Sequence, residues 1–242
     1  MTDQVPIINF NPKRIFITLI SILMVLVGLS IWGQRIRYIG VGDIHGPWHE
    51  FLIDLLMQSF YLDLEGNIPT YYNVVLLLIP TALLFAIGAS KSLLKDKFRY
   101  QWYMLAFVFL LLSIDEASSL HERLIKPMRE FSDAGRLFYF AWIVPGIAAV
   151  ILFGLFFLMF FLHLDRKFKV LFFISLAVYI GGVIGGEIVS GYYAANLGLK
   201  NFTYAVVASL EESVEMIGAS MIIYSLLVYI KDYLPEGITF KV

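Results

Sequence analysis

Eight ionisable side chains that could carry acid–base or metal chemistry lie within or beside long apolar stretches of this chain. They are Asp115, Glu116, His121, Glu122, Glu187, Glu211, Glu212 and Glu215. An ionisable group at the centre of a membrane-spanning helix costs about 2.5–3.5 kcal/mol even on a lenient insertion scale, so such groups are kept where they pair or perform a function. One or two acids could simply hold helices together, but seven exceed that need. The number predicts a functional site made of carboxylates.

Two kinds of chemistry fit these residues. Carboxylate oxygens with one nearby imidazole are typical ligands of hard or borderline cations, and we expect a divalent metal, either Ca, Mg, Mn, a di-iron or dimanganese pair, or Zn. The expected metal ligands are Asp115, Glu122, Glu187, Glu211 and Glu215. The expected catalytic acids or bases are Glu116, His121 and Glu212. The complete di-iron bundle pattern, with two Glu-x-x-His motifs, is absent, so the identity of the metal stays open.

Helical geometry predicts that the acids face one another. At 100° per residue, Asp115 and Glu122 fall on one arc of a helix, and the three glutamates between residues 211 and 215 share a face of another. Helix rise places these acids and Glu187 at a common level, near the middle or in the outer half of the bilayer. We therefore expect acids from three spans to converge on one interior pocket.

The composition defines the class of protein that positions these residues. The chain has 242 residues, of which 60% are hydrophobic and 15% charged, with a mean hydropathy of +0.79. Soluble domains carry nearer a quarter charged residues, so this is an integral membrane protein. The net charge of −1 indicates no nucleic-acid partner and no bulk attraction to acidic lipid. The absence of cysteine excludes disulfides and thiolate metal sites.

Hydropathy and helical periodicity predict an all-α membrane fold in a single domain over residues 1–242. The six expected transmembrane helices cover residues 15–32, 71–89, 102–124, 137–162, 170–192 and 202–230. Residues 47–61 alternate apolar and polar positions at helical spacing and follow Gly46-Pro47, which predicts an amphipathic helix at the membrane surface between the first two spans. The glycines within residues 181–186 predict close approach of a neighbouring helix, and a role beside Glu187 in opening space is the alternative.

Basic residues predict the orientation. If the N-terminus is cytoplasmic, eleven of the 18 Lys and Arg residues lie on the cytoplasmic side: Lys13, Arg14, Lys91, Lys95, Lys97, Arg99, Arg166, Lys167, Lys169, Lys231 and Lys241. The positive-inside rule then favours cytoplasmic termini. The expectation of a bacterial inner membrane comes from the family resemblance described below. The acid-rich ends of the spans face the other side.

A second set of potential ligands occurs before the amphipathic helix. His45 and His49, near Asp43 and Glu50, have a spacing seen in metal sites. Gly46-Pro47 separates the two histidines, so they do not share one regular helical turn. We favour interfacial histidines near a helix start over ligands.

Three strings of the chain resemble motifs of a family of uncharacterised multi-pass bacterial membrane proteins. They are EGNIPT at residues 65–70, SIDEASSLHE at 113–122 and LEESVEMIG at 210–218. The resemblance extends from the loop after the amphipathic helix through the last span. It carries no established activity, and it implies only that the loop over residues 65–70 belongs to the same site.

Three functions fit these observations. The first is a metal-dependent enzyme that acts on a lipid or lipid-linked substrate, because a bound cation activates water and polarises a phosphoryl or acyl oxygen. The second is a proton- or cation-coupled transporter or channel, since intramembrane acids also serve in such pathways. The nearly apolar inner halves of the spans and the lack of an inverted repeat disfavour transport. The third is a non-catalytic assembly or sensor subunit braced by a structural cation.

Overall fold

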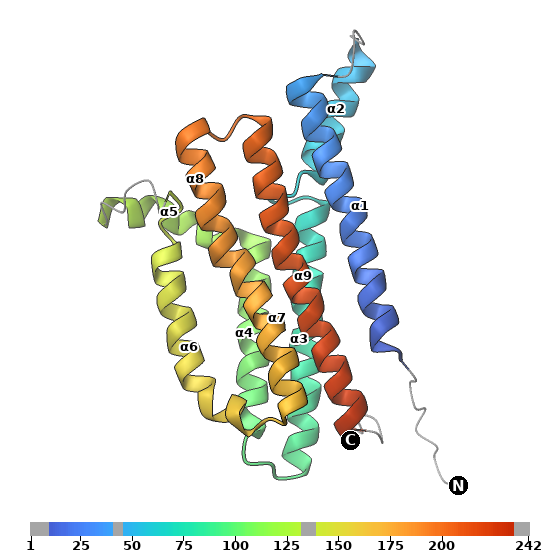
Figure 1. Ribbon diagram of the computed structural model, residues 1–242, viewed down its shortest axis with the longest axis vertical. Coiled ribbons are helices and arrows are strands. Elements are labelled where there is room, and N and C mark those ends of the chain that lie inside the picture. Colours follow the sequence, from blue (N-terminus) through green and yellow to red (C-terminus); the bar gives the residue numbers. More distant parts are fainter. Residues whose placement is uncertain (1–9, 41–45, 132–138, 235–242) are drawn as a thin grey trace.

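The computed structural model describes residues 10–40, 46–131 and 139–234, and every regular element in these ranges is a helix (Figure 1). The helices run alternately up and down in Figure 1. The top of the bundle holds α2 (Pro47–Phe60) and the turn over residues 198–201, and α5 (Leu120–Phe131) projects sideways from the upper half below them. The lower end holds the turns over residues 94–98 and 164–165.

Five continuous helical stretches in the described residues are long and apolar enough to cross a membrane. They are α1 (Pro12–Ile39), α3 (Ile68–Leu93), α6 (Ile143–His163), the stretch α7 (Arg166–Ile180) with η2 (Gly181–Gly186) and α8 (Glu187–Leu197), and α9 (Phe202–Tyr233). A sixth crossing would come from α4 (Arg99–Ser118) taken together with α5. The multi-pass membrane architecture expected from composition is confirmed.

The expected straight span over residues 102–124 is wrong in its second half. α4 ends at Ser118, and α5 leaves it at an angle of 76°. Ser119 adopts a left-handed conformation with φ 50° and ψ 43°, which ends the helix because a side chain in that region is disfavoured. Consequently Asp115 and Glu122 do not lie on one arc of a single helix.

α9 is the central helix of the bundle. It packs against α1, α3, α7, η2 and α8, and 67% of its apolar stretch is buried, compared with 17% in α1 and in α6. Figure 1 shows α9 between α1 on one side and α7–α8 on the other. Buried Leu76, Ile87, Met216 and Ile223 contribute to the apolar core around it. Because α9 carries Glu211, Glu212 and Glu215, its central position brings these acids inside the bundle.

Asparagine caps fix the beginnings of three long helices. The Asn11 side chain accepts hydrogen bonds from the backbone of Lys13 and Arg14 at the start of α1. Asn67 forms a reciprocal capping box with Thr70 at the start of α3, and Asn201 caps α9 through the Tyr204 amide. These caps satisfy backbone N–H groups that have no partner within the helix. The EGNIPT string therefore encodes the start of α3.

The helix expected over residues 47–61 forms as α2. It packs against α1, where Gly33 permits the approach of Leu56, and exposes Trp48, Phe51, Leu52 and Leu55. Glu50, Asp54 and Gln58 of the same helix are also exposed, so its exposed positions include both apolar and polar side chains.

Candidate functional site

Asp115 and His121 form a dyad at the bend between α4 and α5. The backbone N–H of His121 donates to Asp115 Oδ1 at 2.9 Å, and His121 Nδ1 lies 2.9 Å from Asp115 Oδ2. The two carboxylate oxygens of Asp115 therefore contact the same histidine, one at its backbone N–H and the other at its imidazole ring. The bend creates this contact, because Asp115 belongs to the last turn of α4 and His121 to the first turn of α5.

The imidazole of His121 also faces α6. Its ring centroid lies 5.1 Å from that of Trp142, the residue that precedes α6. Trp142 Nε1–H donates to Glu187 Oε1 at 2.7 Å, so the indole joins the dyad to the first residue of α8. Sequence analysis did not identify Trp142, because an indole at the edge of a span is common where membrane and water meet.

Glu187 in turn meets Glu211 on α9. The two carboxyl groups are in hydrogen-bonding contact, with Ser190 as a further partner of Glu211. Glycines allow this approach: a Cβ at Gly186 would lie 2.6 Å from Glu211 Cγ, and one at Gly182 would lie 2.6 Å from the Glu215 amide nitrogen. The close packing predicted for residues 181–186 is confirmed at these two glycines, whereas Gly181 and Gly185 have open space where a Cβ would be.

A second polar group is centred on Asn73 of α3. Asn73 Nδ2–H donates to Glu215 Oε1 at 3.5 Å, and the Asn73 side chain also bonds to Glu116. Asn73 is completely buried, and its Oδ1 has no hydrogen-bond partner among the described residues. A buried amide oxygen without a donor is costly, so this atom marks a place where a proton or a ligand hydroxyl would be stabilised. The sequence signal for Asn73 was a lone amide in an apolar run.

The remaining predicted residues occupy different positions. Glu212 lies on α9, with Glu215, Glu116 and Glu211 among the charged groups near it. Glu122, by contrast, is exposed on α5. His45 lies outside the described residues, and His49 is in the first turn of α2.

Asp63, in the loop between α2 and α3, is a further ionisable group of this region that sequence analysis missed. Tyr61 O–H donates to Asp63 Oδ2 at 2.8 Å, and Tyr204 O–H donates to Oδ1 at 3.2 Å. Burial raises the pKa of Asp63 to about 7, the two tyrosine hydroxyls lower it, and the nearby Glu187 and Glu122 carboxylates raise it. The signal in the sequence was a Tyr-x-Asp-x-Glu run in a loop otherwise typical of a turn.

Glu65 of the same loop lies beside the dyad. Burial and the Glu122 charge raise the pKa of Glu65, while His121 and a hydrogen bond with Ser119 lower it. The EGNIPT loop is thus next to Ser119 and His121, as the resemblance implied.

The metal site expected from sequence is not shown by these contacts. Within residues 10–40, 46–131 and 139–234, no three His, Cys, Asp or Glu side chains are arranged so that they could hold one ion. Glu122 is exposed on α5, and Asp115 has both oxygens on His121. Four of the acids lie in contact with His, Trp, Asn or another Glu.

The helical bundle and its apolar surface define a multi-pass α-helical membrane protein. Comparison with known families then identifies it further: the family described as "Domain of unknown function (DUF8692)" matches residues 17–229, and the chain belongs to that family. No curated protein and no solved structure matches the chain.

Proposed function

We propose that this protein is a membrane-embedded enzyme that performs acid–base chemistry on a lipid or lipid-linked substrate. The observation that carries the proposal is the Asp115–His121 dyad, in which both carboxylate oxygens hold one histidine at 2.9 Å. A carboxylate that accepts Nδ1–H fixes the tautomer of the ring and leaves Nε2 as its basic atom. Nε2 would take a proton from an attacking water or hydroxyl and return it to the leaving group.

The partial exposure of the dyad supports access by a substrate. The side chains of His121 and Asp115 are 24% and 32% exposed. α5 carries exposed Leu120 and Leu124 beside exposed Glu122 and Arg123, which suits a helix lying at the membrane surface. A lipid headgroup at that depth would meet the imidazole without leaving the bilayer.

The interior below the site supports an enzyme over a transporter. A small cavity of about 80 Å³ lies deeper in the bundle, and only apolar side chains such as Leu84, Phe109, Phe157 and Leu226 line it. An ion or proton crossing there would find no polar partner. We propose that the carboxylate groups open to one side of the membrane only.

We further propose that both chain termini are cytoplasmic and that the site faces the outer leaflet of a bacterial inner membrane. The lower end of the bundle carries Lys91, Lys95, Arg166 and Lys167, in agreement with the positive-inside rule. Accessibility of single cysteines to a membrane-impermeant thiol reagent tests this orientation. Labelling of the Lys95→Cys variant from the periplasmic side would contradict the proposed orientation.

The acid–base proposal is tested with bacterial polar lipids. The purified protein in nanodiscs made from a bacterial polar lipid extract is incubated, and the lipids are analysed by mass spectrometry. Wild type is expected to convert a lipid species, and His121→Ala to lower the rate by about 10²–10⁴-fold. His163→Ala, at the opposite end of the bundle, is the control and keeps the wild-type rate. Absence of conversion by wild type, or equal rates for His121→Ala, overturns the proposal.

We propose that the acid–base step uses protein side chains, because within the described residues no three His, Cys, Asp or Glu side chains are arranged to hold one ion. The expectation of a divalent cation has its own test. Elemental analysis of the purified protein, with and without chelator, measures bound Ca, Mg, Mn, Fe and Zn. One equivalent of metal, lost together with activity in chelator, would replace the metal-free step by a metal-dependent one.

Proton-coupled transport is the second candidate, and buried hydroxyls below the acids favour it. Ser175 Oγ and Ser225 Oγ are 2.9 Å apart in the core, and the Ser220 hydroxyl is fully buried without a partner among the described residues. Such hydroxyls could pass a proton between α7 and α9. Proteoliposomes containing a pH-sensitive dye test this: proton flux that disappears in Glu211→Gln and Ser220→Ala supports transport, and absence of flux removes it.

A further inference from the structure

An open groove between α7 and α9 lies at the lower end, away from the dyad. It has a volume of about 550 Å³ and is lined by Arg166, Lys167, Val170, Leu171, Tyr224 and Val228. None of these residues belongs to the carboxylate groups described above. The groove therefore requires its own explanation.

The lining changes from basic to apolar along the groove. Arg166 and Lys167 form the first turn of α7, whereas Val170 and Leu171 follow one turn deeper. On α9, Tyr224 and Val228 are four residues apart and lie on the same face. The Tyr224 ring also packs against Phe16 of α1, with centroids 5.6 Å apart. An apolar wall with charge only at one end matches an acyl chain below a headgroup.

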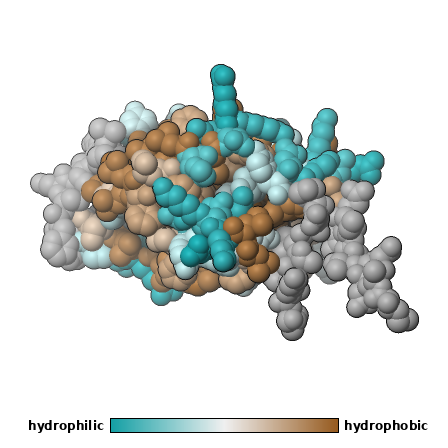
Figure 2. All heavy atoms as spheres, turned by 90° about the horizontal axis from the view of Figure 1, so that it is seen from below, coloured by the Kyte–Doolittle hydropathy of each residue, from teal (hydrophilic) through white to brown (hydrophobic). Residues whose placement is uncertain are grey.

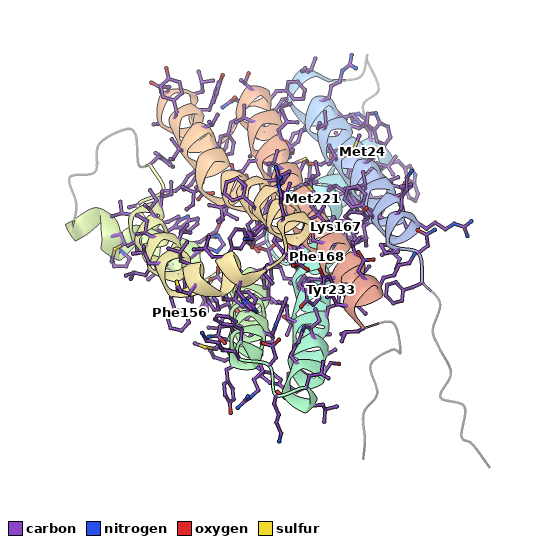
Figure 3. The ribbon with its side chains drawn as sticks, turned by 60° about the horizontal axis from the view of Figure 1, so that its bottom comes forward. Met24, Phe156, Lys167, Phe168, Met221 and Tyr233 are labelled. Atoms are coloured by element: carbon purple, nitrogen blue, oxygen red, sulfur yellow. The ribbon has the colours of Figure 1, made fainter. Side chains whose placement is uncertain are left out.

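The charges at the rim favour an anionic headgroup. Arg166 is exposed, and Lys167 Nζ donates to Asp232 Oδ2 at 2.5 Å. Lys169, also in the first turn of α7, donates to the Leu162 carbonyl at 2.8 Å. Two acids, Asp165 and Asp232, lie near these three basic residues. Asp232 pairs with Lys167 and not with Arg166, so the charge of Arg166 can meet a ligand. Figure 3 shows Lys167 and Phe168 at the start of α7 close to Tyr233 at the end of α9.

The lower face of the molecule shows the same combination of charged and apolar side chains. In Figure 2, hydrophilic side chains project over this end while apolar side chains remain visible between and beside them. Basic pockets between transmembrane helices on the cytoplasmic side are recurrent sites for acidic lipids. The net charge of −1 excludes a bulk attraction to such lipids, but a local basic rim does not depend on it.

We propose that this groove binds one anionic phospholipid, with its phosphate at Arg166 and Lys167 and an acyl chain along Val170, Tyr224 and Val228. Asp232 limits the affinity because it competes with the phosphate for Lys167. The site is separate from the proposed enzymatic function, and its occupant stabilises the contact of α7 with α9. A free phosphate would lack the apolar contacts and bind weakly.

Native mass spectrometry of the full-length protein in detergent, titrated with phosphatidylglycerol or phosphatidylcholine, tests the site. Wild type is expected to prefer phosphatidylglycerol. Arg166→Gln should weaken phosphatidylglycerol binding about fivefold, since each basic side chain near a membrane surface contributes about 1 kcal/mol. Lys167→Gln should have a smaller effect because Asp232 already pairs with it. Asp232→Asn should strengthen binding, by up to about fivefold.

Two controls separate this site from general charge and from free phosphate. Lys95→Gln removes an exposed charge at the same end, outside the groove, and should leave binding unchanged. Glycerol phosphate in large excess should not displace the lipid, whereas Val228→Trp should block both lipids by filling the groove. Equal binding of the two lipids by wild type, or unchanged phosphatidylglycerol binding in Arg166→Gln and Asp232→Asn, overturns the proposal.

Discussion

The two ends of the bundle treat their acidic residues differently. At the lower end, Asp96 lies 3.7 Å from Lys91 and Asp232 lies 2.5 Å from Lys167, so two carboxylates have a lysine counter-charge. At the upper end, the ion pair found among the described residues joins Asp115 to His121, and four other acids meet Trp, Asn, Ser, Tyr or another Glu: Asp63, Glu187, Glu211 and Glu215. A lysine stays charged near pH 7 and keeps its partner acid ionised, whereas an uncharged partner or another carboxyl group allows the acid to be protonated.

This difference indicates that acid–base chemistry is expected at the upper end. Two facing carboxyl groups, such as those of Glu187 and Glu211, repel each other unless they hold a proton between them or bind a cation. Their positions are fixed by glycines on η2 and by the central helix α9, so they cannot move apart without loss of packing. We therefore expect proton exchange at the upper end and fixed charge at the lower end.

The largest effect is expected from the dyad. Asp115→Asn replaces the acceptor of Nδ1–H by an amide that can donate instead, so the ring is no longer held in the productive tautomer. In the lipid-conversion assay kcat should fall about 10²–10⁴-fold with KM nearly unchanged, as expected for lost general-base catalysis. Asp115→Glu should restore part of the rate. An Asp115→Asn enzyme as fast as wild type would remove the distinction between the two ends.

The next largest effect is expected on stability, when a substitution disturbs the close packing of α9. A Cβ at Gly218 would clash with the backbone of Tyr179 on α7, so Gly218→Ala should lower the free energy of unfolding by about 1–3 kcal/mol through overpacking. Gly28→Ala on α1 is the matched control, because nothing lies within 4 Å of its Cβ. Thermal unfolding in detergent compares the two. Equal melting temperatures would show that α7 and α9 are not in tight contact.

The sequence predicted the helical class and most of the spans because hydropathy over about 20 residues is a strong local signal. It also placed Glu187 beside glycines and three acids on one face of the last span. It failed at the α4–α5 bend, because a serine in a left-handed conformation has no distinctive local pattern and the angular argument assumed one straight helix. It also missed Asn73 and Trp142, whose roles depend on neighbours distant in sequence. The metal ligands stay a prediction, because residue type and helical spacing do not show whether three side chains from different helices meet around one ion.

The comparison of the two ends can also be tested through the pH dependence of stability that Asp63 causes at the upper end. Its pKa of about 7 in the folded protein is above the value of 3.8 for an unperturbed aspartate. The folded protein therefore holds the proton more tightly than the unfolded chain, and its stability falls as pH rises from about 4 to about 7. Asp63→Asn removes this loss, so the variant should gain stability relative to wild type above pH 7. Melting temperatures at pH 5 and pH 8 measure the change.

A constant difference between Asp63→Asn and wild type at both pH values would contradict the linkage. The comparison of two proteins at each pH removes the contribution of the other acids, which titrate in both. Tyr61→Phe, which takes away the donor to Oδ2, should shift the transition to higher pH because that hydrogen bond favours the charged form.

The smallest effect is expected from the lysine pair at the lower end. Lys167 and Asp232 have side chains that are 61% and 35% exposed, and exposed ion pairs contribute about 0–1 kcal/mol. The double variant Lys167→Gln with Asp232→Asn should therefore melt within a few degrees of wild type at every pH between 5 and 8, and the small difference should shrink in high salt. A double-mutant cycle with the two single variants isolates the pair. A coupling above about 2 kcal/mol, or one that varies between pH 5 and pH 8, would mean that the lower end also depends on proton exchange. The contrast between fixed charge below and exchangeable protons above would then not hold.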